Sequence, residues 1–511
     1  MKRIFTIILV VCLIFSLAAC GGGGGGTAEK DTLTIGATND YGTLDFIHQA
    51  TSGDFTFAAK MYCEPLMSVI DDEGTVKWLL ATSLDMVTPT QWVFHLREGV
   101  KFSNGNPFTS EDVMFTMDLG NNTAGQYPWF PQLDWENCKI IDEYTIEFNF
   151  HNYDLSFMTN FSLLGMLDKE SYDPSAYAST PIGTGPYVVT EYVTNSHLHM
   201  TANEDYWGEP AKIKNLEFKV LNEDTQRVNA IETKSVDMTS VPTQDFEYVE
   251  GLGGFELTIQ PANQANAIWF NTAAGGMFTS IDSRMAVCHA IDKDSIINLT
   301  YDGRATRCDW PHSMSSKDLE DRSLNLNDSY KIGYDVELAK QYAEKAGLVG
   351  KDIRIITNGT PAYVSMAEVI QQNLIDIGVN VTINNYDEAT YNMLSQDTTL
   401  FDLYLRNLST PSNTAAQNYN GWLPNVPYLA DGSWYLGENR DQMLEWIDTI
   451  VSIADEQERA EPLFEMTKAF VDSPAWYAIC EAERAFATNS DLDGVTFTPY
   501  GQAFWNEWSW K

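Results

Sequence analysis

Basic residues are scarce in this 511-residue chain, which has 31 lysines and arginines against 71 aspartates and glutamates and a formal net charge of −40. A protein that binds nucleic acid needs basic patches to neutralise phosphates. The composition therefore argues against nucleic acid as a partner. The direct consequence of so acidic a surface is solubility through mutual repulsion, and attraction of cationic solutes stays open as a second interpretation.

Short catalytic motifs are also missing. The sequence contains no HExxH, no GxSxG, no phosphate-binding loop and no paired cysteine ligands. The histidines are scattered, and only His197 and His199 alternate on a predicted strand, in a spacing that metal ligands can use. We expect no metal site, no cofactor and no enzymatic reaction. A secreted glycoside hydrolase stays open as the rival class, because two carboxylates suffice for that chemistry.

Cysteine is sparse as well. Seven cysteines occur, without a CxxC pair or a zinc-like spacing. Export would permit disulfides, and Cys288 with Cys308 is the first pair to test. Buried free thiols are the alternative.

Long apolar runs are absent beyond the N-terminus. Two basic residues, an apolar run over 4–17 and small residues before Cys20 predict an export signal at 1–19. The apolar run is shorter than the roughly 20 residues that span a bilayer. Residues 17–20, Leu-Ala-Ala-Cys, resemble the lipobox of bacterial lipoproteins, which implies an acylated Cys20. The glycine-rich stretch at 20–30 predicts a flexible tether.

Two kinds of secondary-structure pattern follow one another along the chain. Apolar residues alternate over 92–96 and 144–150, which predicts antiparallel strands with one buried face. Between them, Thr109 with Asp112 three residues later predicts the start of a capped helix. Two βαβ units, whose strands should be parallel, are predicted elsewhere: strand 216–221, helix 224–234 and strand 236–241, then strand 352–356, a helix ending at Gly378 and strand 379–383. A strand at 402–405 and a helix capped by Asp335 complete the second unit.

Two separated βαβ regions predict two α/β lobes. Open sheets of this kind bind ligands beyond the carboxyl ends of their strands. That rule selects the loops 38–44, 222–225, 357–361 and 406–413. Two lobes that face each other across these loops would close on a solute by a hinge motion.

Five blocks of sequence resemble one family when they are taken together in order and spacing. They are WVFHLREGVKFSNG at 92–105, FTSEDV at 108–113, PIGTGPY at 181–187, NEDYWG at 203–208 and RMAVCHAID at 284–292. They are similar to the family 5 extracellular solute-binding proteins of ABC importers, which include peptide, nickel and some sugar receptors. Gly105 and the glycines of residues 183–186 are expected at turns that need a left-handed backbone or a fixed φ.

The resemblance implies a fold and a domain order. The expected class is a type II, cluster C periplasmic-binding-protein-like α/β fold of two lobes, with an antiparallel β-rich subdomain inserted in the first lobe. The expected ranges are 31–65, 181–268 and 493–511 for lobe I, 66–180 for the insertion and 269–492 for lobe II. Chain crossovers between lobes are expected near 267–271 and near 495.

One departure from the family bears on the solute. Peptide-binding members carry an aspartate shortly after the strand that corresponds to 401–405, where it pairs with the α-amino group of the peptide. Here residues 406–413 contain no carboxylate and begin with Arg406. A guanidinium at this place could hold a carboxylate or a phosphate, and a salt bridge within the protein is its alternative role. Aromatic candidates for contact with the solute have core packing as their alternative role.

The sequence thus predicts an exported, lipid-anchored, monomeric solute-binding protein that works with ABC permease subunits and their ATPases. Its solute is expected to be a peptide or a peptide-like molecule, with an oligosaccharide or another anionic or polar solute as the alternative. A lipoprotein that binds peptides for adhesion or signalling would share the fold. The predicted ligand-binding residues are Tyr41, Gly42, Thr43, Trp269, Asn271, Arg406, Asn407, Ser409 and Trp422.

Overall fold

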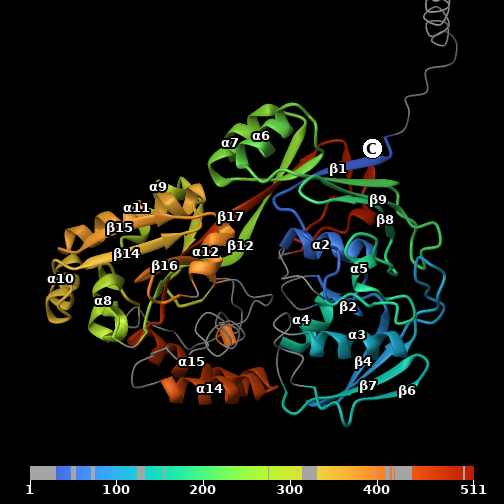
Figure 1. The fold of residues 1–511 in the computed structure, drawn as a ribbon, viewed down its shortest axis with the longest axis horizontal. Coiled ribbons are helices and arrows are strands. Elements are labelled where there is room, and N and C mark those ends of the chain that lie inside the picture. Colours follow the sequence, from blue (N-terminus) through green and yellow to red (C-terminus); the bar gives the residue numbers. More distant parts are fainter. Residues whose placement is uncertain are drawn as a thin grey trace, which may run out of the picture.

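Two α/β lobes make up the computed structural model, and long strands join them (Figure 1). The structure describes residues 30–47, 53–70, 75–123, 133–153, 156–273, 275–312, 331–395, 397–408, 415–416, 419, 440–498 and 501–511. The expected export signal, Cys20, Ser409 and Trp422 lie outside these ranges.

One 11-stranded sheet runs through both lobes. Its strand order is β15-β14-β16-β12-β17-β11-β1-β10-β9-β8, and β13 pairs with β17 beside this path. The strands are β15 (Asn380–Asn385), β14 (Asp352–Thr357), β16 (Leu403–Leu408), β12 (Phe255–Phe270), β17 (Trp476–Asn489), β11 (Met238–Val241), β1 (Thr32–Ala37), β10 (Asn215–Val220), β9 (His197–Ala202), β8 (Tyr187–Val193) and β13 (Ala305–Arg307).

Lobe I contains the first predicted βαβ unit. Strand β1 lies between β10 and β11 and pairs with both in parallel. Helix α6 (Asp224–Glu232) connects β10 to β11, as the sequence predicts. On β1 and β10, Leu33, Ile35, Leu216 and Phe218 are buried at every second position, so this face of the sheet packs on the core.

Lobe II contains the second predicted unit. Strand β14 pairs in parallel with β15 and with β16. Helix α11 (Pro361–Asp376) connects β14 to β15 and buries Met366, Ile370 and Leu374. Its end is set by Gly378 at φ +84°, in the left-handed region that favours glycine. Helix α10 (Val336–Lys345) starts at the predicted cap, where Asp335 accepts a hydrogen bond from the Leu338 amide.

The insertion is a separate four-stranded antiparallel sheet in the order β4-β5-β7-β6. Its strands are β4 (Ala81–Thr88), β5 (Gln91–Leu96), β7 (Thr145–Asn149) and β6 (Lys139–Asp142). Trp92 and Phe94 face Phe148 and Ile146 across β5 and β7 and are fully buried, which confirms the predicted antiparallel strands. Helix α3 (Ser110–Asn122) has the predicted capping box of Thr109 and Asp112. The insertion and lobe I share one hydrophobic core, so they pack as a unit.

The other elements are helices and the strands of two small two-stranded sheets, β2-β3 and β18-β19. They are α2 (Gly53–Tyr62), β2 (Met67–Val69), β3 (Val76–Trp78), α4 (Ser156–Leu163), α5 (Pro174–Tyr177), η2 (Thr243–Asp245), α7 (Phe246–Leu252), η3 (Met277–Thr279), α8 (Ile281–Ala290), α9 (Lys293–Tyr301), α12 (Glu388–Leu394), α14 (Arg440–Ser452), α15 (Glu456–Asp472), β18 (Leu492–Asp493), η8 (Trp505–Glu507) and β19 (Ser509–Trp510). Among the described residues, no helix combines the length and the apolar character that a membrane span requires.

The glycine-rich block at 183–186 differs from the sequence expectation. Gly105 has φ +92°, as a left-handed turn requires. Gly183 and Gly185 do not have positive φ; instead they pack against the backbone at the end of α2. A Cβ atom at Gly183 would overlap the carbonyl oxygen of Tyr62, and one at Gly185 would overlap that of Met61. Close backbone approach, and not turn conformation, therefore requires glycine at these two positions.

The block NEDYWG at 203–208 supplies two hydrogen-bond donors to a buried carboxyl group. Glu64, which follows α2, is buried and accepts hydrogen bonds from Tyr206 Oη at 2.7 Å and Trp207 Nε1 at 2.8 Å. Burial raises the pKa of Glu64 to about 7, although these hydrogen bonds act in the opposite direction. The block thus holds a buried carboxyl group of lobe I and is not available to a solute.

The cysteines in the described residues are all free thiols. Cys288 and Cys308 are buried and unlinked, so the pair considered first for a disulfide does not form one. Burial raises the pKa of both thiols, which makes the reactive thiolate scarce.

Candidate functional site

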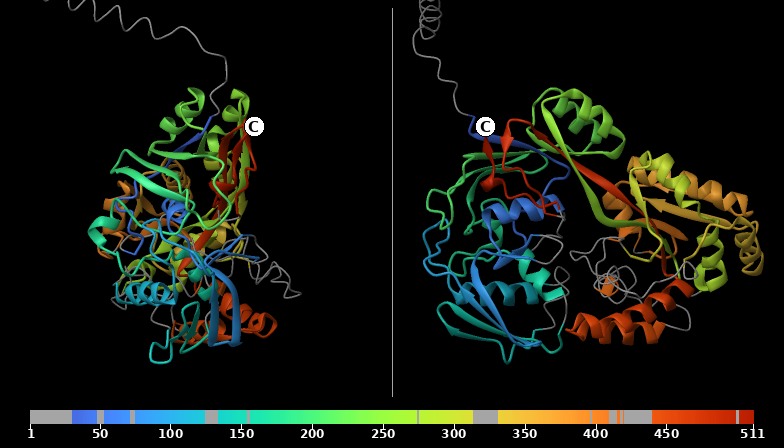
Figure 2. Two further views of the ribbon diagram at one scale, coloured as in Figure 1. Left: turned by 90° about the vertical axis from the view of Figure 1, so that its right-hand side faces the viewer. Right: turned by 180° about the vertical axis from the view of Figure 1, so that it is seen from behind.

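The crossover between the lobes is formed by β12 and β17, which pair antiparallel over most of their lengths (Figure 2). The first part of β12 pairs only with β17, whereas residues 265–270 also pair with β16 of lobe II. The pairing is irregular between Pro261 and Ala265. Proline cannot donate to the ladder, so such a break is expected at this residue. On β17, the partner changes from β13 at 480–482 to β11 at 485–488.

The sequence expectation places the crossovers near 267–271 and near 495. In the structure, both long strands change partner earlier, at 261–265 and at 482–485. The difference arises because each crossover lies within a continuous strand and has no loop or turn residues to mark it.

The carboxyl ends of the parallel strands converge on this crossover from both sides. In lobe II, Leu408 at the end of β16 pairs with Ala265. In lobe I, Val241 at the end of β11 pairs with Ala485. Since open sheets bind ligands beyond the carboxyl ends of their strands, the crossover is where a solute would meet both lobes.

Two of the predicted lobe II residues lie beside the crossover. Arg406 and Asn407 are half-buried on β16, opposite Ala267 and Asn266 of β12. The Asn407 side-chain amide donates to Gln264 Oε1 at 2.9 Å. Arg406 and Asn407 are thus at the place where lobe II meets the connecting strands.

Two other predicted residues of lobe II are occupied by packing and internal hydrogen bonds. Trp269 is 1% exposed and stacks on Tyr404, with ring centroids 5.6 Å apart, and against Trp476 at 4.9 Å. The side-chain amide of Asn271 donates to the carbonyl oxygens of Thr398 at 2.6 Å and Phe401 at 2.7 Å. Trp269 therefore belongs to the core of lobe II, and Asn271 fixes the chain that leads into β16.

The predicted lobe I residues lie in the loop after β1. Tyr41 is buried against Phe218, with ring centroids 6.4 Å apart. Gly42 has φ +68°, and its amide donates to Asp40 Oδ2 at 2.8 Å. The Thr43 hydroxyl accepts from the Asp45 amide at 3.1 Å. Tyr41 also lines a cavity.

That cavity is an apolar pocket at the carboxyl end of β1 and along β11. Its lining residues are Ile35, Gly36, Ala37, Tyr41, Phe218, Met238, Thr239, Ser240, Phe486, Gly501 and Trp505. Its volume is about 30 Å³, far below the roughly 300–1,000 Å³ of a complete ligand site. The pocket can therefore hold one group of a solute but not a whole solute.

Arg484 gives the pocket a charged neighbour. It lies on β17 at the crossover and donates to Gln260 Oε1 at 3.3 Å. A Cβ atom on Gly501 would come within 3.0 Å of the Arg484 guanidinium carbon, so the guanidinium packs against the pocket lining. Burial lowers the pKa of Arg484 to about 10, while the charge of Glu481 acts in the opposite direction. The site therefore combines an apolar pocket with a partly desolvated cation, which favours an anionic group.

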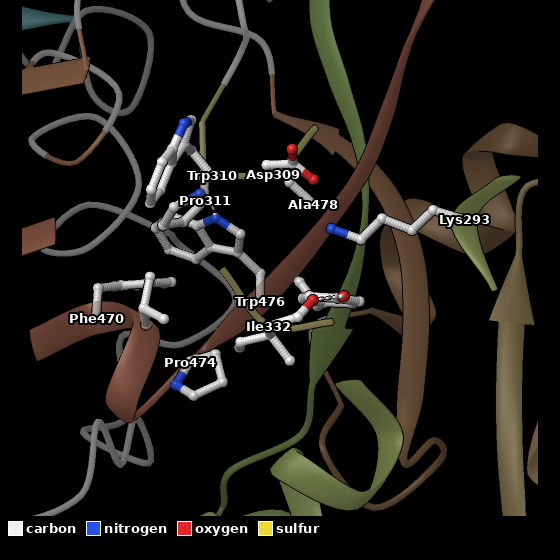
Figure 3. Close-up of a pocket in the computed structure, with 11 residues that line it drawn as sticks. Lys293, Asp309, Trp310, Pro311, Ile332, Phe470, Pro474, Trp476 and Ala478 are labelled. Atoms are coloured by element: carbon white, nitrogen blue, oxygen red, sulfur yellow. Dashed lines mark hydrogen bonds between the residues drawn. The ribbon is translucent and has the colours of Figure 1, made fainter. Parts of the chain in front are cut away.

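A second cavity lies in lobe II, between α15 and the start of β17 (Figure 3). Its residues Trp476, Trp310, Asp309 and Lys293 come together around a volume of about 20 Å³. The Lys293 ammonium donates to the Cys308 carbonyl oxygen at 2.6 Å, and burial lowers its pKa to about 8. The Trp476 indole donates to the Pro311 carbonyl oxygen at 2.6 Å. Because these polar groups bind the protein itself, we assign this cavity no role with the solute.

Sequence reasoning missed Arg484, Phe486, Gly501 and Trp505. These residues join Tyr41 and Phe218 only in the folded chain, because β1, β10, β17 and the C-terminal segment are far apart in sequence. No local spacing connects them. Tyr41 was selected from the sequence because ligands bind at strand ends. The same rule cannot select residues in the middle of a long connecting strand such as β17.

A sheet shared by two lobes, with strand ends that converge on the connecting strands, defines a two-lobed solute-binding protein. Residues 75–428 match the family model for bacterial extracellular solute-binding proteins, family 5 Middle, so the chain belongs to this family, whose members serve ABC importers.

The comparisons with individual proteins agree with this assignment. The nickel-binding periplasmic protein of Escherichia coli K12 is 26% identical over 408 residues, which are 74% of this chain and 75% of that protein. Heme-binding protein A of Haemophilus influenzae is 24% identical over 452 residues, or 80% and 79% of the two chains. The crystal structure of a dipeptide-binding protein from Pseudoalteromonas sp. SM9913 in complex with Met-Leu superposes with a TM-score of 0.82 at 22% identity, covering 94% of this chain and 100% of that one. The last comparison confirms the two-lobed α/β fold.

Proposed function

We propose that this protein captures a short peptide or peptide-like solute by its carboxylate end at the crossover, and delivers it unchanged to an ABC permease. The observation that carries the proposal is the apolar pocket of lobe I beside the guanidinium of Arg484. The C-terminal residue of a peptide presents a side chain and a carboxylate on the same Cα atom. An apolar pocket next to a cation suits this pair of groups.

The rest of the site supports the same choice. Gln260 and Gln264 bring amide side chains to the crossover, where their oxygens accept from Arg484 and Asn407. Amides can pair with both the N–H and the C=O groups of a peptide backbone. Residues 406–413 contain no carboxylate to pair with an α-amino group. The dipeptide in the similar solved structure also shows that this fold can hold a peptide.

The mechanism we propose is closure of the lobes around the solute. The ranges expected from the sequence are 31–65, 181–268 and 493–511 for lobe I, 66–180 for the insertion and 269–492 for lobe II. The partner changes of the two long strands move the proposed boundaries between the lobes to 261–265 and 482–485. The irregular pairing of β12 between Pro261 and Ala265 offers a hinge, because the ladder is already interrupted there. A solute that contacts both lobes would shift the population towards the closed state. The protein would act as a monomer and catalyse no reaction.

A thermal-shift screen of the purified protein tests the solute class. We expect peptides with an apolar C-terminal residue and a free carboxylate to raise the melting temperature, because a ligand that binds only the folded state stabilises it. Their C-terminal amides should give a much smaller shift, while N-acetylated peptides should still bind. Equal binding of amides and free acids would rule out carboxylate capture. Shifts with oligosaccharides alone, or turnover of a glycoside, would replace the peptide proposal.

Arg484 provides the matching variant. We expect Arg484→Met to weaken binding of such a peptide about 10- to 100-fold, since a hydrogen bond to a charged group contributes about 1.5–3 kcal/mol. Arg304→Met is the control, because it removes another guanidinium near the crossover, one that pairs with Glu483 at 3.7 Å and faces the Phe246 ring. Isothermal titration should show unchanged affinity for this control. Equal losses in both variants would contradict a specific role of Arg484.

The lipid anchor is the second part of the proposal. The described chain starts at Lys30, whose ammonium lies 2.5 Å from Asp237 Oδ1 and 3.8 Å from the centre of the Trp510 ring. These contacts fix the start of lobe I. The ten Cα-to-Cα steps from Cys20 to Lys30 would span at most about 35 Å, so acylated Cys20 would hold lobe I near the membrane.

Cys20 can be tested directly in cells. We expect the wild-type protein to incorporate an alkyne-labelled fatty acid and to sediment with membranes. Cys20→Ser should lose the label and appear in the soluble or secreted fraction, because no second attachment signal is predicted. Cys63→Ser serves as the control, since Cys63 is a buried thiol of lobe I. Membrane attachment that survives Cys20→Ser would disprove the anchor.

A further inference from the structure

The outer face of the lobe I sheet carries a cluster of metal-binding side chains. Leu198 and Met200 of β9 are buried, so strand alternation places His197 and His199 together on the opposite, more exposed face. Their rings stack with centroids 4.3 Å apart. Strands β8 and β9 stand at the end of the sheet that is farthest from lobe II in strand order (Figure 1).

The neighbouring strand adds a carboxylate to the two imidazoles. The pairing of β8 with β9 shifts between Val189 and Glu191, which places Glu191 opposite His199. One carboxylate oxygen, Glu191 Oε2, lies 3.4 Å from His197 Nε2 and 3.3 Å from His199 Nδ1. His197 Nε2 is buried and makes no hydrogen bond to any described residue.

These distances match those expected around a tetrahedral metal ion. With bonds of about 2.0–2.1 Å to nitrogen and oxygen, two ligand atoms of one ion lie about 3.3 Å apart. Both carboxylate-to-imidazole distances already have this value. The ligand atoms of the three residues all lie within 4.8 Å of one another, so a movement of one ring by about 1.5 Å would complete the set.

The second nitrogen of each imidazole already has a partner. His197 Nδ1 lies 2.9 Å from the Ser196 hydroxyl, and His199 Nε2 lies 3.6 Å from Glu217 Oε1. Glu217 in turn accepts from the Thr34 hydroxyl at 3.3 Å. Metal-bound histidines usually have such outer partners, which fix the tautomer and orient the ring.

We propose that Glu191, His197 and His199 bind a divalent transition-metal ion, with water in the fourth position. Two imidazoles and one carboxylate suit Zn²⁺, and Ni²⁺ and Cu²⁺ are chemically possible competitors. The site is separate from the pocket beside Arg484, because Glu217 and Phe218 are neighbours on β10 and face opposite sides of the sheet. The ion would link β8 to β9 and stabilise lobe I whether or not a solute is bound.

Zinc titration of the full-length protein tests this site. Equilibrium dialysis against ZnCl₂ should give one bound ion, and His197→Ala and His199→Ala should each weaken it by at least about 100-fold. Glu217→Gln should weaken it about 10-fold, because it removes an outer partner and no ligand. His95→Ala is the control: His95 lies 3.0 Å from Asp85 in the insertion, but no third ligand is nearby among the described residues.

Two further measurements test zinc binding without depending on whether the histidine variants fold. X-ray absorption of the zinc-loaded wild-type protein should show two imidazole nitrogens around the ion. Zinc should also raise the melting temperature of Arg484→Met as much as that of the wild type, which separates this site from the solute site. Stoichiometric binding that persists in the His197→Ala/His199→Ala double variant, or no saturable binding, would overturn the proposal.

Discussion

Gly183→Ala is expected to lower the free energy of unfolding by about 3 kcal/mol or more, the upper range for overpacking a dense core. The added methyl group would overlap the Tyr62 carbonyl oxygen. That oxygen is backbone and accepts from the Gly185 amide at 3.1 Å, while the Gly183 carbonyl accepts from the Ser103 amide at 2.9 Å. Neither chain can move away without breaking these hydrogen bonds. Urea unfolding followed by circular dichroism measures the loss.

Gly251→Ala is the matched control with the opposite expected sign. Gly251 lies in α7, is exposed, and would place its new methyl group in open space. Alanine is favoured over glycine in a helix by about 1 kcal/mol, so this variant should be slightly more stable than the wild type. If Gly183→Ala unfolded at the same urea concentration as the wild type, close packing would not explain the glycine-rich block.

Trp269→Ala is expected to lower the free energy of unfolding by about 4 kcal/mol, as for other buried tryptophans replaced by alanine. The indole is buried between Tyr404 and Trp476, so its removal leaves a large cavity in lobe II. Trp269→Phe keeps an aromatic ring and should cost about 1–2 kcal/mol, while solute affinity should stay close to that of the wild type. Calorimetric unfolding and isothermal titration on the same samples separate stability from binding.

Trp310→Ala is a suitable comparison. Trp310 is half-buried at the edge of the lobe II cavity, and its replacement should cost only about 1 kcal/mol, because surface truncation leaves little cavity. A Trp269→Phe protein that unfolds normally but loses its solute would show that this ring contacts the solute, contrary to its position in the core.

Much of the fold could be predicted from the sequence, because the signals are local. The alternation around Trp92 and Phe94, the cap at Thr109 and the helix end at Gly378 each depend on residues within one or two turns of chain. Two parallel βαβ units followed from the order of strands and helices. These local patterns are sufficient to predict two lobes and an antiparallel insertion.

The candidate site was only partly predictable. The rule about strand ends selects Tyr41, Arg406 and Asn407. The structure places Tyr41 in the loop after β1, but Arg406 and Asn407 lie within β16 beside the crossover and not in the predicted loop, because the strand continues to Leu408. The sequence could not show whether Trp269 packs in the core or stacks on a solute, since both roles place a tryptophan in the same local pattern. Arg484 was missed because it lies within a continuous strand. It is next to the pocket because its guanidinium packs against Gly501, which lines the pocket and lies far away in sequence from Tyr41 and Phe218 of the same lining.

By itself, the sequence determined the locally patterned strands and helices, the two-lobed class and the acidic charge, because periodicity, capping and charge are properties of neighbouring residues. Only the tertiary structure decided why Gly183 must be glycine, where the lobes cross, and which groups line the pocket. It also brought Glu191 opposite His199. Each of these depends on contacts between strands, and such contacts are set by pairing register, which no local pattern records.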